Sequence, residues 1–526
     1  MLHSGRSQSA RRVSAERPSV SFLVTIEAMP GISLKSRLMM SVAVSLCSVL
    51  IPAECATYYV AKTGSDSNAC TQAQPCLTIG RATSLATRPG AIIQVGAGTF
   101  TESLTISHGG SSGQNILFRG QDGSGCPMTP TLDVNHPTGK RPRSSVIISG
   151  AWTIAASYVT VDCFHFESTG NGTLYISPKT TGGSITNSEF DGNGLSNPGS
   201  GPQFNGVGSS SSTSYASSYT VQGNYIHGVS TGIWLACNSC QISENEITSL
   251  SGDEPGTDHD YIDAWGTNTI IRHNYMWNNT SNACDGYDCH MDCIQTWNTT
   301  ANGTEVSKNI TFDRNVCFNH MEGVIVQDNA GNGDVADWTV TNNVFAYGPW
   351  DDGSGHLAAA GTVHPWCWVF EDGNLGSGVF ANNTCIDGMA GFRNTNGSSI
   401  YKNNIYYLSS TGSVYSNAGS SSTGANNLYY VVGQTLTATY PGDIVNKKPI
   451  FISFGNGSAN QRCIGCNFSL QATSPAIDHG VNTSPLVGFD LKGVTRPQGE
   501  AYDIGAYEII PGQSPLPPAN VTATRH

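Results

Sequence analysis

The sequence predicts an all-β protein built as a solenoid, in which short strands stack coil upon coil. Only 12% of the 526 residues are charged and 60 residues are glycine, whereas typical globular chains are about 25% charged. Long stretches with the apolar period of an α-helix are missing. The third observation is a short phrase that recurs through the middle of the chain, as stacked structural units require.

The repeated phrase is an apolar residue, two polar residues, an asparagine, any residue and an apolar residue. The spacing between copies varies from 20 to 41 residues, which is typical of a solenoid whose coils carry loops of different lengths. One coil cannot bury its own apolar face, so neighbouring coils must share a core. The asparagines shared by the copies are Asn224, Asn245, Asn274, Asn315, Asn343, Asn383 and Asn403.

These asparagines have a structural role in the predicted solenoid. Asparagine tolerates the left-handed backbone conformation and bonds to neighbouring backbone groups. If the side chains stack at one bend, each amide can bond to the next coil, about 4.8 Å away. We therefore expect an asparagine ladder along the solenoid rather than a row of functional residues.

Composition and charge exclude several classes of protein. Lys+Arg is 25 and Asp+Glu is 38, which gives a net charge of −13. Because phosphate contacts need clustered Lys and Arg, this acidic chain without a basic cluster excludes a nucleic-acid partner. A chain with 38% hydrophobic residues and nine tryptophans is also not disordered.

The two ends of the chain have patterns of their own. Residues 29–56 are interpreted as a signal peptide, because the apolar run 38–52 follows two basic residues and precedes small ones. Residues 1–28 are interpreted as an upstream segment before the true start, and the Pro-rich residues 511–526 as a linker or tail. We therefore expect a secreted protein with no membrane span after signal removal.

The cysteines agree with export to an oxidising compartment. Fourteen of the sixteen lie outside the leader, and an even number suits disulfides. We expect Cys70 and Cys76 to close one small loop. The two Cys-x-x-Cys pairs, at 237–240 and 463–466, have zinc binding as an alternative interpretation.

Four segments carry a resemblance to a known family. They are YYVAKTGSDSNACTQAQPCLTI (58–79), PGAIIQVGAGTFTESLTI (89–106), FSLQATSPAIDHG (468–480) and DIGAYE (503–508). Through them the chain resembles the secreted bacterial right-handed parallel β-helix proteins of the pectate-lyase-like superfamily. The resemblance covers 57–510. It implies a right-handed parallel β-helix with a short N-terminal capping helix (79–87) and long loops between coils. It also implies a polysaccharide partner, and we expect a monomer.

Aromatic side chains concentrate between residues 253 and 372. Aliphatic residues suffice for a β-helix core, so we expect tryptophans on the outer face, where they stack on sugar rings. Packing within loops is the alternative. The seven tryptophans of this segment are Trp265, Trp277, Trp297, Trp338, Trp350, Trp366 and Trp368.

Three segments of this region align as consecutive coils: 260–265, 292–297 and 322–327. A His-Met-acid motif that repeats after 30 residues supports the alignment. Because side chains alternate between the two faces of a strand, alternate positions point outward. The predicted inward residues are Ile262, Ile294, Val324, Ala264, Thr296 and Val326. The predicted outward residues are Asp263, Gln295, Ile325, Trp265, Trp297 and Gln327.

Asp260, Asp292 and Glu322 stack at the start of the three aligned strands. Like charges on coils about 4.8 Å apart either raise a pKa or require a cation. One interpretation is a calcium site, since Ca²⁺ takes about six to eight oxygen ligands. The other is that each acid caps backbone amides at a turn.

The resemblance implies a polysaccharide lyase that acts by β-elimination on a uronate-containing polymer. A lyase must neutralise the uronate carboxylate and remove the C5 proton with a base. We expect neutralisation by a metal at the acid stack or by Arg272. Proton removal then falls to His290 or His320, with Asp263 close by; the other candidate bases are Lys308 and Arg314. The predicted substrate-binding residues are Trp265, Trp297, Gln295, Gln327 and Trp368.

Two other functions remain open from the sequence. A glycoside hydrolase needs two carboxyls, about 5–5.5 Å apart for retention or about 6.5–9.5 Å for inversion. A non-catalytic polysaccharide-binding or adhesin-like surface protein would need no such pair. The carboxyls available for hydrolysis are Asp263, Asp292, Asp351, Asp352, Glu371 and Asp372.

Overall fold

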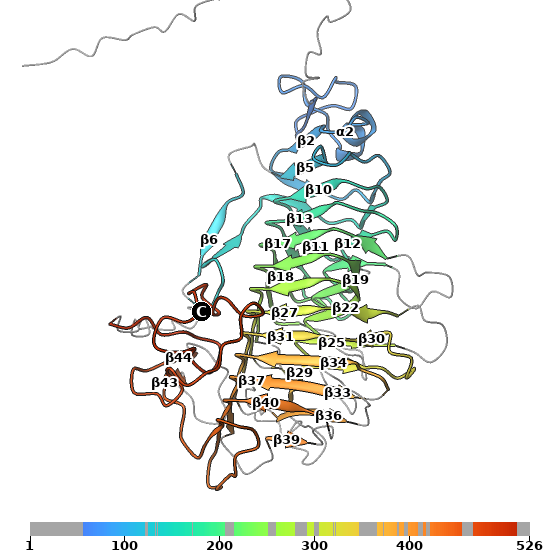
Figure 1. The fold of residues 1–526 in the computed structure, drawn as a ribbon. Coiled ribbons are helices and arrows are strands. Elements are labelled where there is room, and N and C mark those ends of the chain that lie inside the picture. The colour runs from blue at the N-terminus through green and yellow to red at the C-terminus, as the bar shows by residue number, and fades with distance from the viewer. Residues whose placement is uncertain are drawn as a thin grey trace, which may run out of the picture. The chain divides into compact units, whose positions relative to one another are not determined.

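Figure 1 shows the computed structural model of the chain. It describes residues 56–512 apart from 121–124, 132, 134, 171, 206–214, 251–258, 279–291, 299–304, 319, 321, 347–365, 372, 387–388, 394–397, 409–413, 417–420 and 455–465. Residues 1–55 of the leader and residues 513–526 of the tail therefore lie outside the described residues. Among the described residues no helix is long and apolar enough to cross a membrane.

Three long parallel sheets run along the molecule and confirm the predicted fold, a right-handed parallel β-helix. Sheet A contains β1 (Thr57–Val60), β2 (Ile92–Val95), β5 (Ile116–Gly120), β10 (Val159–Asp162), β13 (Ser184–Thr186), β17 (Thr220–Gln222), β20 (Gln241–Ser243), β23 (Ile270–Arg272), β27 (Thr311–Asp313), β31 (Thr339–Thr341), β34 (Ser377–Ala381), β37 (Ser398–Lys402) and β40 (Thr423–Ala425).

Sheet B follows sheet A in each coil, and sheet C completes the coil. Sheet B contains β3 (Gly98–Phe100), β8 (Val146–Ile148), β11 (His165–Glu167), β14 (Glu189–Asp191), β18 (Tyr225–His227), β21 (Glu246–Thr248), β24 (Tyr275–Trp277), β28 (Val316–Phe318), β32 (Val344–Ala346), β35 (Thr384–Ile386), β38 (Ile405–Leu408), β41 (Leu428–Val431) and β42 (Ile444–Val445). Sheet C contains β4 (Leu104–Ile106), β9 (Trp152–Ile154), β12 (Leu174–Ile176), β15 (Pro202–Phe204), β19 (Ile233–Asn238), β22 (Ile262–Thr267), β25 (Ile294–Trp297), β29 (Glu322–Gln327), β33 (Trp366–Glu371), β36 (Met389–Arg393) and β39 (Tyr415–Ser416), with β16 (Ala216–Ser217), β26 (Ser307–Lys308) and β30 (Val335–Ala336) beside them.

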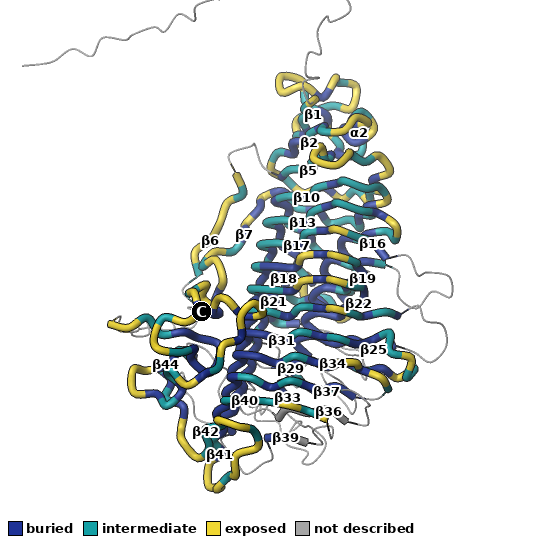
Figure 2. Tube along the Cα trace, viewed as in Figure 1, coloured by how far each residue is buried: buried dark blue, intermediate teal, exposed yellow. Residues whose placement is uncertain are grey.

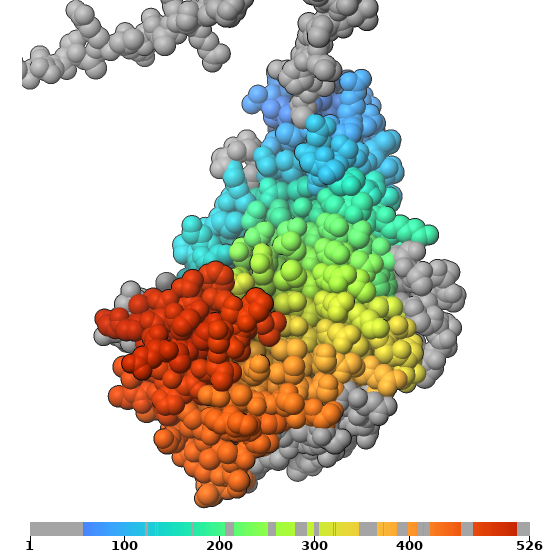
Figure 3. Space-filling view, viewed as in Figure 1, coloured from blue at the N-terminus to red at the C-terminus, as the bar shows by residue number. Residues whose placement is uncertain are grey.

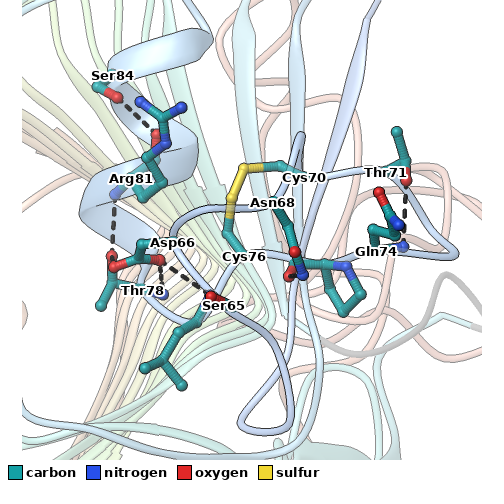
Figure 4. Close-up of a disulfide and its surroundings, with 12 residues drawn as sticks. Ser65, Asp66, Asn68, Cys70, Thr71, Gln74, Cys76, Thr78, Arg81 and Ser84 are labelled. Carbon is teal, nitrogen blue, oxygen red and sulfur yellow. Dashed lines mark hydrogen bonds between the residues drawn. A yellow bond between two sulfur atoms is a disulfide. The ribbon is translucent and has the colours of Figure 1, made fainter.

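A capped helix lies at the N-terminal end of the coils, as predicted. Helix α2 (Ile79–Leu85) is two residues shorter than the predicted 79–87. Its N-cap Thr78 accepts a hydrogen bond from the Arg81 amide at 3.1 Å. Asp66 in turn accepts from the Thr78 amide at 2.9 Å. The predicted Cys70–Cys76 disulfide closes the neighbouring loop, as Figure 4 shows.

The asparagine ladder forms at the bend between sheets A and B. The side-chain oxygen of each ladder residue accepts hydrogen bonds from the backbone amide and the side-chain amide of the previous one, at 2.8–3.1 Å. The prediction is wrong at the last copy, because the rung after Asn383 is Asn404 and not Asn403. Asn403 instead donates to the Val481 carbonyl. The ladder then continues through Asn427 to Asp443.

The residue before each ladder position adopts the left-handed conformation. It is an asparagine or glycine at most coils, including Gly223, Asn342 and Asn403. These residue types occupy that region at little cost. The sharp bend therefore comes from this residue, while the next asparagine bonds the bend to its neighbours.

The core is more aromatic than we expected. Trp152, Trp338 and Trp368 are fully buried together with many Ile, Val and Phe residues, and Figure 2 shows the strands of the coils largely in the colours of buried and half-buried residues. The expectation that aliphatic residues fill the core is therefore wrong. Stacked coils place large rings in register, as with Trp368 on Phe380 at 4.7 Å.

Two hairpins lie outside the coils. The first is β6 (Met128–Pro130) with β7 (Lys140–Pro142), and the second is β43 (Phe451–Phe454) with β44 (Cys466–Leu470). Asn135 of the first hairpin donates to the Cys466 carbonyl at 3.0 Å. Figure 3 shows the C-terminal segment, in red, against the coils and near the cyan first hairpin.

Disulfides join several of the described cysteines. Cys237 and Cys240 are bonded to each other, which leaves no thiolate there for the alternative zinc site. The remaining pairs are Cys126–Cys163, Cys293–Cys317 and Cys367–Cys385. Cys463 lies outside the described residues.

We predict that Asn274→Ala lowers the free energy of unfolding by about 3 kcal/mol. It leaves the buried backbone and side-chain amides of Asn245 without their acceptor, and such losses cost about 1–3 kcal/mol each. The measurement is the urea midpoint followed by circular dichroism. Asn482→Ala is the control, since Asn482 is exposed and outside the ladder, and its midpoint should hardly move. Equal shifts of the midpoint in the two variants would contradict a stabilising role of the ladder hydrogen bonds.

Candidate functional site

The predicted alignment of the three coils is correct. Gln295 pairs with Asp263 and with Ile325, and Trp297 pairs with Gln327. The inward positions are fully buried, as predicted. The register of sheet C therefore agrees with the register that we derived from the sequence.

The stacked acids cap the backbone of the next coil. Asp260 Oδ1 accepts from the Asp292 amide at 2.7 Å, and Asp292 Oδ1 accepts from the Glu322 amide at 3.1 Å. Both aspartates are fully buried. A calcium ion would need about six to eight oxygens, whereas one oxygen of each aspartate is already engaged with backbone. The oxygens of Asp260 and Asp292 therefore fit the capping of backbone amides better than a calcium site.

The outward face of sheet C is less open than predicted. Asp263 and Gln295 are almost completely buried, and Trp265 is fully buried, so Trp265 is not placed to stack on a polymer. Trp297 is half-buried and packs edge-on against Trp265 at 4.7 Å. Gln327 donates to Glu371 at 2.8 Å.

The other predicted site residues are not gathered at one place. Trp368 lies inside the coil, so its assignment to substrate binding is wrong. His320 is fully buried, and burial lowers its pKa to about 3. It is therefore neutral and out of reach of a polymer, beside the Cys293–Cys317 disulfide.

The predicted cation and the second predicted base lie elsewhere. Arg272 ends a strand of sheet A, on a different face from Asp263 in sheet C. His290 lies outside the described residues, as do Asp351, Asp352 and Asp372. The described residues therefore do not assemble the predicted lyase site.

A cluster of histidines and acids that we did not predict lies on the outer face of sheet B. Parallel pairing places His165 beside Glu189, and Asp191 beside His227. His227 Nε2 lies 3.2 Å from Glu189 Oε1, and its Nδ1 lies 3.7 Å from Asp191 Oδ1. His165 lies 3.9 Å from Glu189 and 3.7 Å from Asp191. Two histidines thus flank two carboxylates across three coils; we call these four residues the His-acid cluster.

The first hairpin supplies arginines to this face. Arg143 Nη1 lies 3.2 Å from Glu189 Oε1. Further along the face, Arg141 and His136 both bond to the buried Glu246. Burial raises the pKa of Glu246, but the hydrogen bonds from His136 and Arg141 outweigh it and hold the pKa below 4.5. The hairpin is therefore fixed to sheet B by buried ion pairs.

The cluster is accessible from outside. The exposed fraction of the side chain is 53% for Arg143, 28% for Asp191, 21% for His227 and 16% for His165, against 2% for Glu189. A charged substrate group can approach Arg143 and His227, whereas His165 lies deeper and its Nε2 is buried. Glu189 lies behind them as a buried countercharge.

Electrostatics couple His165 to Asp191. Burial lowers the pKa of His165, but the contact with Asp191 and the charges of Glu189 and Glu167 outweigh it, so the pKa lies above 6.5. The contact with His165 likewise lowers the pKa of Asp191 below 3.8, against the effect of burial. An imidazolium with a raised pKa can donate a proton near neutral pH.

Comparisons with known proteins found similar solved structures but no matching family. No family model matches the chain, and no curated protein matches it. Among solved structures, the chain is similar to the pectate lyase Pel9A (12% identity, TM-score 0.41, covering 86% of this chain and 96% of that chain). It is also similar to XylC in complex with xylose (13%, 0.40, 86% and 98%) and to the PL6 family polysaccharide lyase Pedsa3628 from Pseudopedobacter saltans (10%, 0.39, 70% and 92%). The assignment of the fold rests on the three parallel sheets of this chain.

The chain is a right-handed parallel β-helix. Within this fold, the sequence held one signal for the His-acid cluster. Positions one and three after each ladder residue point outward on sheet B, and after Ser188 and Asn224 these are Glu189, Asp191, Tyr225 and His227. The tryptophans concentrate elsewhere, between residues 253 and 372, and give no indication of this pattern.

We predict that His165 titrates above pH 6.5 in the folded protein and that Asp191→Asn lowers this pKa. The raised pKa of His165 stabilises the fold below pH 6.5, and this stabilisation is lost as the pH rises through the folded-state pKa. The lowered pKa of Asp191 stabilises the fold above pH 3.8, and this stabilisation is lost as the pH falls through the folded-state pKa. Both contributions to stability are therefore fully present between pH 3.8 and 6.5. NMR titration of the imidazole signals measures the pKa of His165 in the wild type and in the variant. His320 is the control, because its pKa of about 3 keeps it from titrating in this range. An unchanged His165 pKa in the variant would rule out the coupling.

Proposed function

We propose that this protein is a secreted, carbohydrate-active enzyme whose active site is the His-acid cluster. More narrowly, we propose a polysaccharide lyase that acts on a uronate-containing polymer. The observation that carries the proposal is the convergence of two partly exposed histidines, two carboxylates and the half-exposed Arg143 on one outer face. Titratable groups that meet on an open surface with shifted pKa values are typical of catalytic sites.

Each residue has a role in the proposed reaction. Arg143 receives the uronate carboxylate and stabilises the charge that develops when C5 loses its proton. His227 takes that proton, and the buried Glu189 beside it stabilises the imidazolium that results. His165, whose pKa is raised, donates a proton to the departing oxygen as the C4–O bond breaks and the C4–C5 double bond forms. No step in this scheme is routed through a metal ion.

The surroundings of the site fit an extracellular enzyme. Five disulfides join described cysteines, and such bonds persist in oxidising compartments. The outer face of sheet C offers a second region for sugar, where the half-buried rings of Trp234 and Trp297 lie. Only sugar units of the polymer beyond the reacting ones would bind there.

A hydrolase is the second candidate, because Glu189 and Asp191 project from the same face of one strand. Residues two apart along a strand are about 6.6 Å apart. That falls within the range of about 6.5–9.5 Å that inverting glycosidases use. Glu189 Oε1 lies 3.2 Å from both Arg143 Nη1 and His227 Nε2, and this engagement of Glu189 favours the lyase.

We predict that the protein releases unsaturated uronate products, seen as ultraviolet absorbance, from pectate, alginate or glucuronan. Arg143→Gln should lower kcat/KM about 100-fold, and His227→Asn should lower kcat about 100-fold or more. Lys140→Gln is the matched control, since Lys140 is an exposed cation on the same hairpin outside the cluster. Activity should persist with a chelator, and lost activity would instead support the calcium interpretation.

Products with new reducing ends but no double bond would favour hydrolysis by Glu189 and Asp191. Undiminished lyase activity in both variants would refute the assignment of the site. Binding of the polymers without any product would leave the non-catalytic interpretation as the better one.

A further inference from the structure

A cavity lies where three parts of the chain meet. Its volume is about 260 Å³, and it is bounded by the first hairpin, the bend between sheets A and B, and the C-terminal segment. Figure 3 shows the red C-terminal segment beside the green and yellow coils that form one wall. The lining residues that bear charge or can bear it are His136, Glu244, His273, Arg314 and Lys492. None of them belongs to the His-acid cluster.

The three wall residues from the coils occupy an unusual backbone position. Glu244, His273 and Arg314 are the residues that precede three successive ladder asparagines, with φ values of 58°, 53° and 56°. Asparagine or glycine takes this position at most other coils, because the left-handed region strains larger residues. Three consecutive exceptions, all lining one cavity, point to contact of these side chains with a ligand.

The chemistry of the wall favours an anion that also carries hydroxyl groups. Arg314 Nε donates a hydrogen bond to Asp313 Oδ2 at 2.6 Å. The two terminal nitrogens of Arg314 have no hydrogen-bond partner among the described residues. Burial and the nearby Arg314 and Arg272 lower the pKa of His273, so its neutral ring can both donate and accept. Glu244 accepts from Gln222 at 2.9 Å and adds an acceptor for a hydroxyl. Lys492 supplies a second cation from the C-terminal segment.

His136 connects this cavity to the surface of sheet B. Its Nδ1 accepts from the Gly139 amide at 3.0 Å, so its Nε2 carries the hydrogen that Glu246 receives at 3.0 Å. Glu246 lies two coils beyond Glu189, about 10 Å along the same face. The cavity therefore adjoins the region where the proposed substrate lies.

We propose that this cavity binds a carboxylate-bearing sugar residue, with the carboxylate on Arg314 and Lys492 and the hydroxyls on His273 and Glu244. The cavity is smaller than the sites of about 300–1,000 Å³ that bind drug-sized ligands, which suits a single sugar residue. The choice of a sugar acid rests on the proposed function. The bound residue is a free sugar acid or a non-reacting unit of the polymer.

Isothermal titration calorimetry of the protein with D-galacturonate, D-glucuronate and a short oligogalacturonate tests the proposal, with D-galactose and sulfate for comparison. The variants are His273→Asn and Arg314→Asn, because asparagine is the residue that other coils use at this position. Both should therefore keep the fold, with a thermal midpoint that is unchanged or higher. The matched control is Lys179→Asn, which removes a cation from another left-handed position (φ 67°) outside the cavity.

Saturable binding of the sugar acids should weaken on the order of tenfold in each cavity variant and stay within about twofold in the control. Tighter binding of the oligomer than of the monomers identifies a polymer subsite, and equal binding identifies a site for free sugar acid. The proposal is overturned if neither sugar acid binds, if sulfate or galactose binds equally well, or if the variants bind like wild type. Turnover is measured separately, so failure of lyase activity with binding intact refutes only the proposed function.

Discussion

The constraint on which the rest of the structure depends is the rise of about 4.8 Å between coils, fixed at one bend by a ladder of buried amides. Because every coil keeps the same register there, each position of a strand lies beside the same position of its neighbours. Equivalent side chains of successive coils therefore form columns. A charged side chain in a column lies next to the residues one coil above and below, and its charge must be compatible with them. The outer face of sheet B satisfies this condition by placing His165, Glu189, Tyr225 and Glu246 in one column.

This constraint explains what the sequence could predict. The asparagine phrase contains both the bend and the strands on each side, so the stacked coils followed from local pattern. The alignment of three coils gave the register of Asp263 with Gln295, whereas the cap and the handedness came from the family resemblance. The single error at Asn403 arose where two asparagines are adjacent and only the second bonds along the ladder. Burial on sheet C was harder to predict, because alternation tells which way Trp265 points but not what covers it.

The candidate sites depend on contacts between distant segments. Arg143 reaches Glu189 from a hairpin that leaves the coils, and Lys492 reaches the bend from far along the chain. Neither approach leaves a periodic signal in the sequence. The strained positions of His273 and Arg314 were visible only once the backbone showed which residue of the bend takes positive φ. Local pattern thus defines the scaffold, while the chemistry is assembled by the segments attached to it.

The most direct test of this account is a crystal structure of the protein with a bound acidic oligosaccharide. The account predicts density along the outer face of sheet B, with a uronate carboxylate on Arg143 and the reacting carbon within reach of His227. An oligosaccharide bound instead on sheet C against Trp234 and Trp297, with the His-acid cluster untouched, would contradict it.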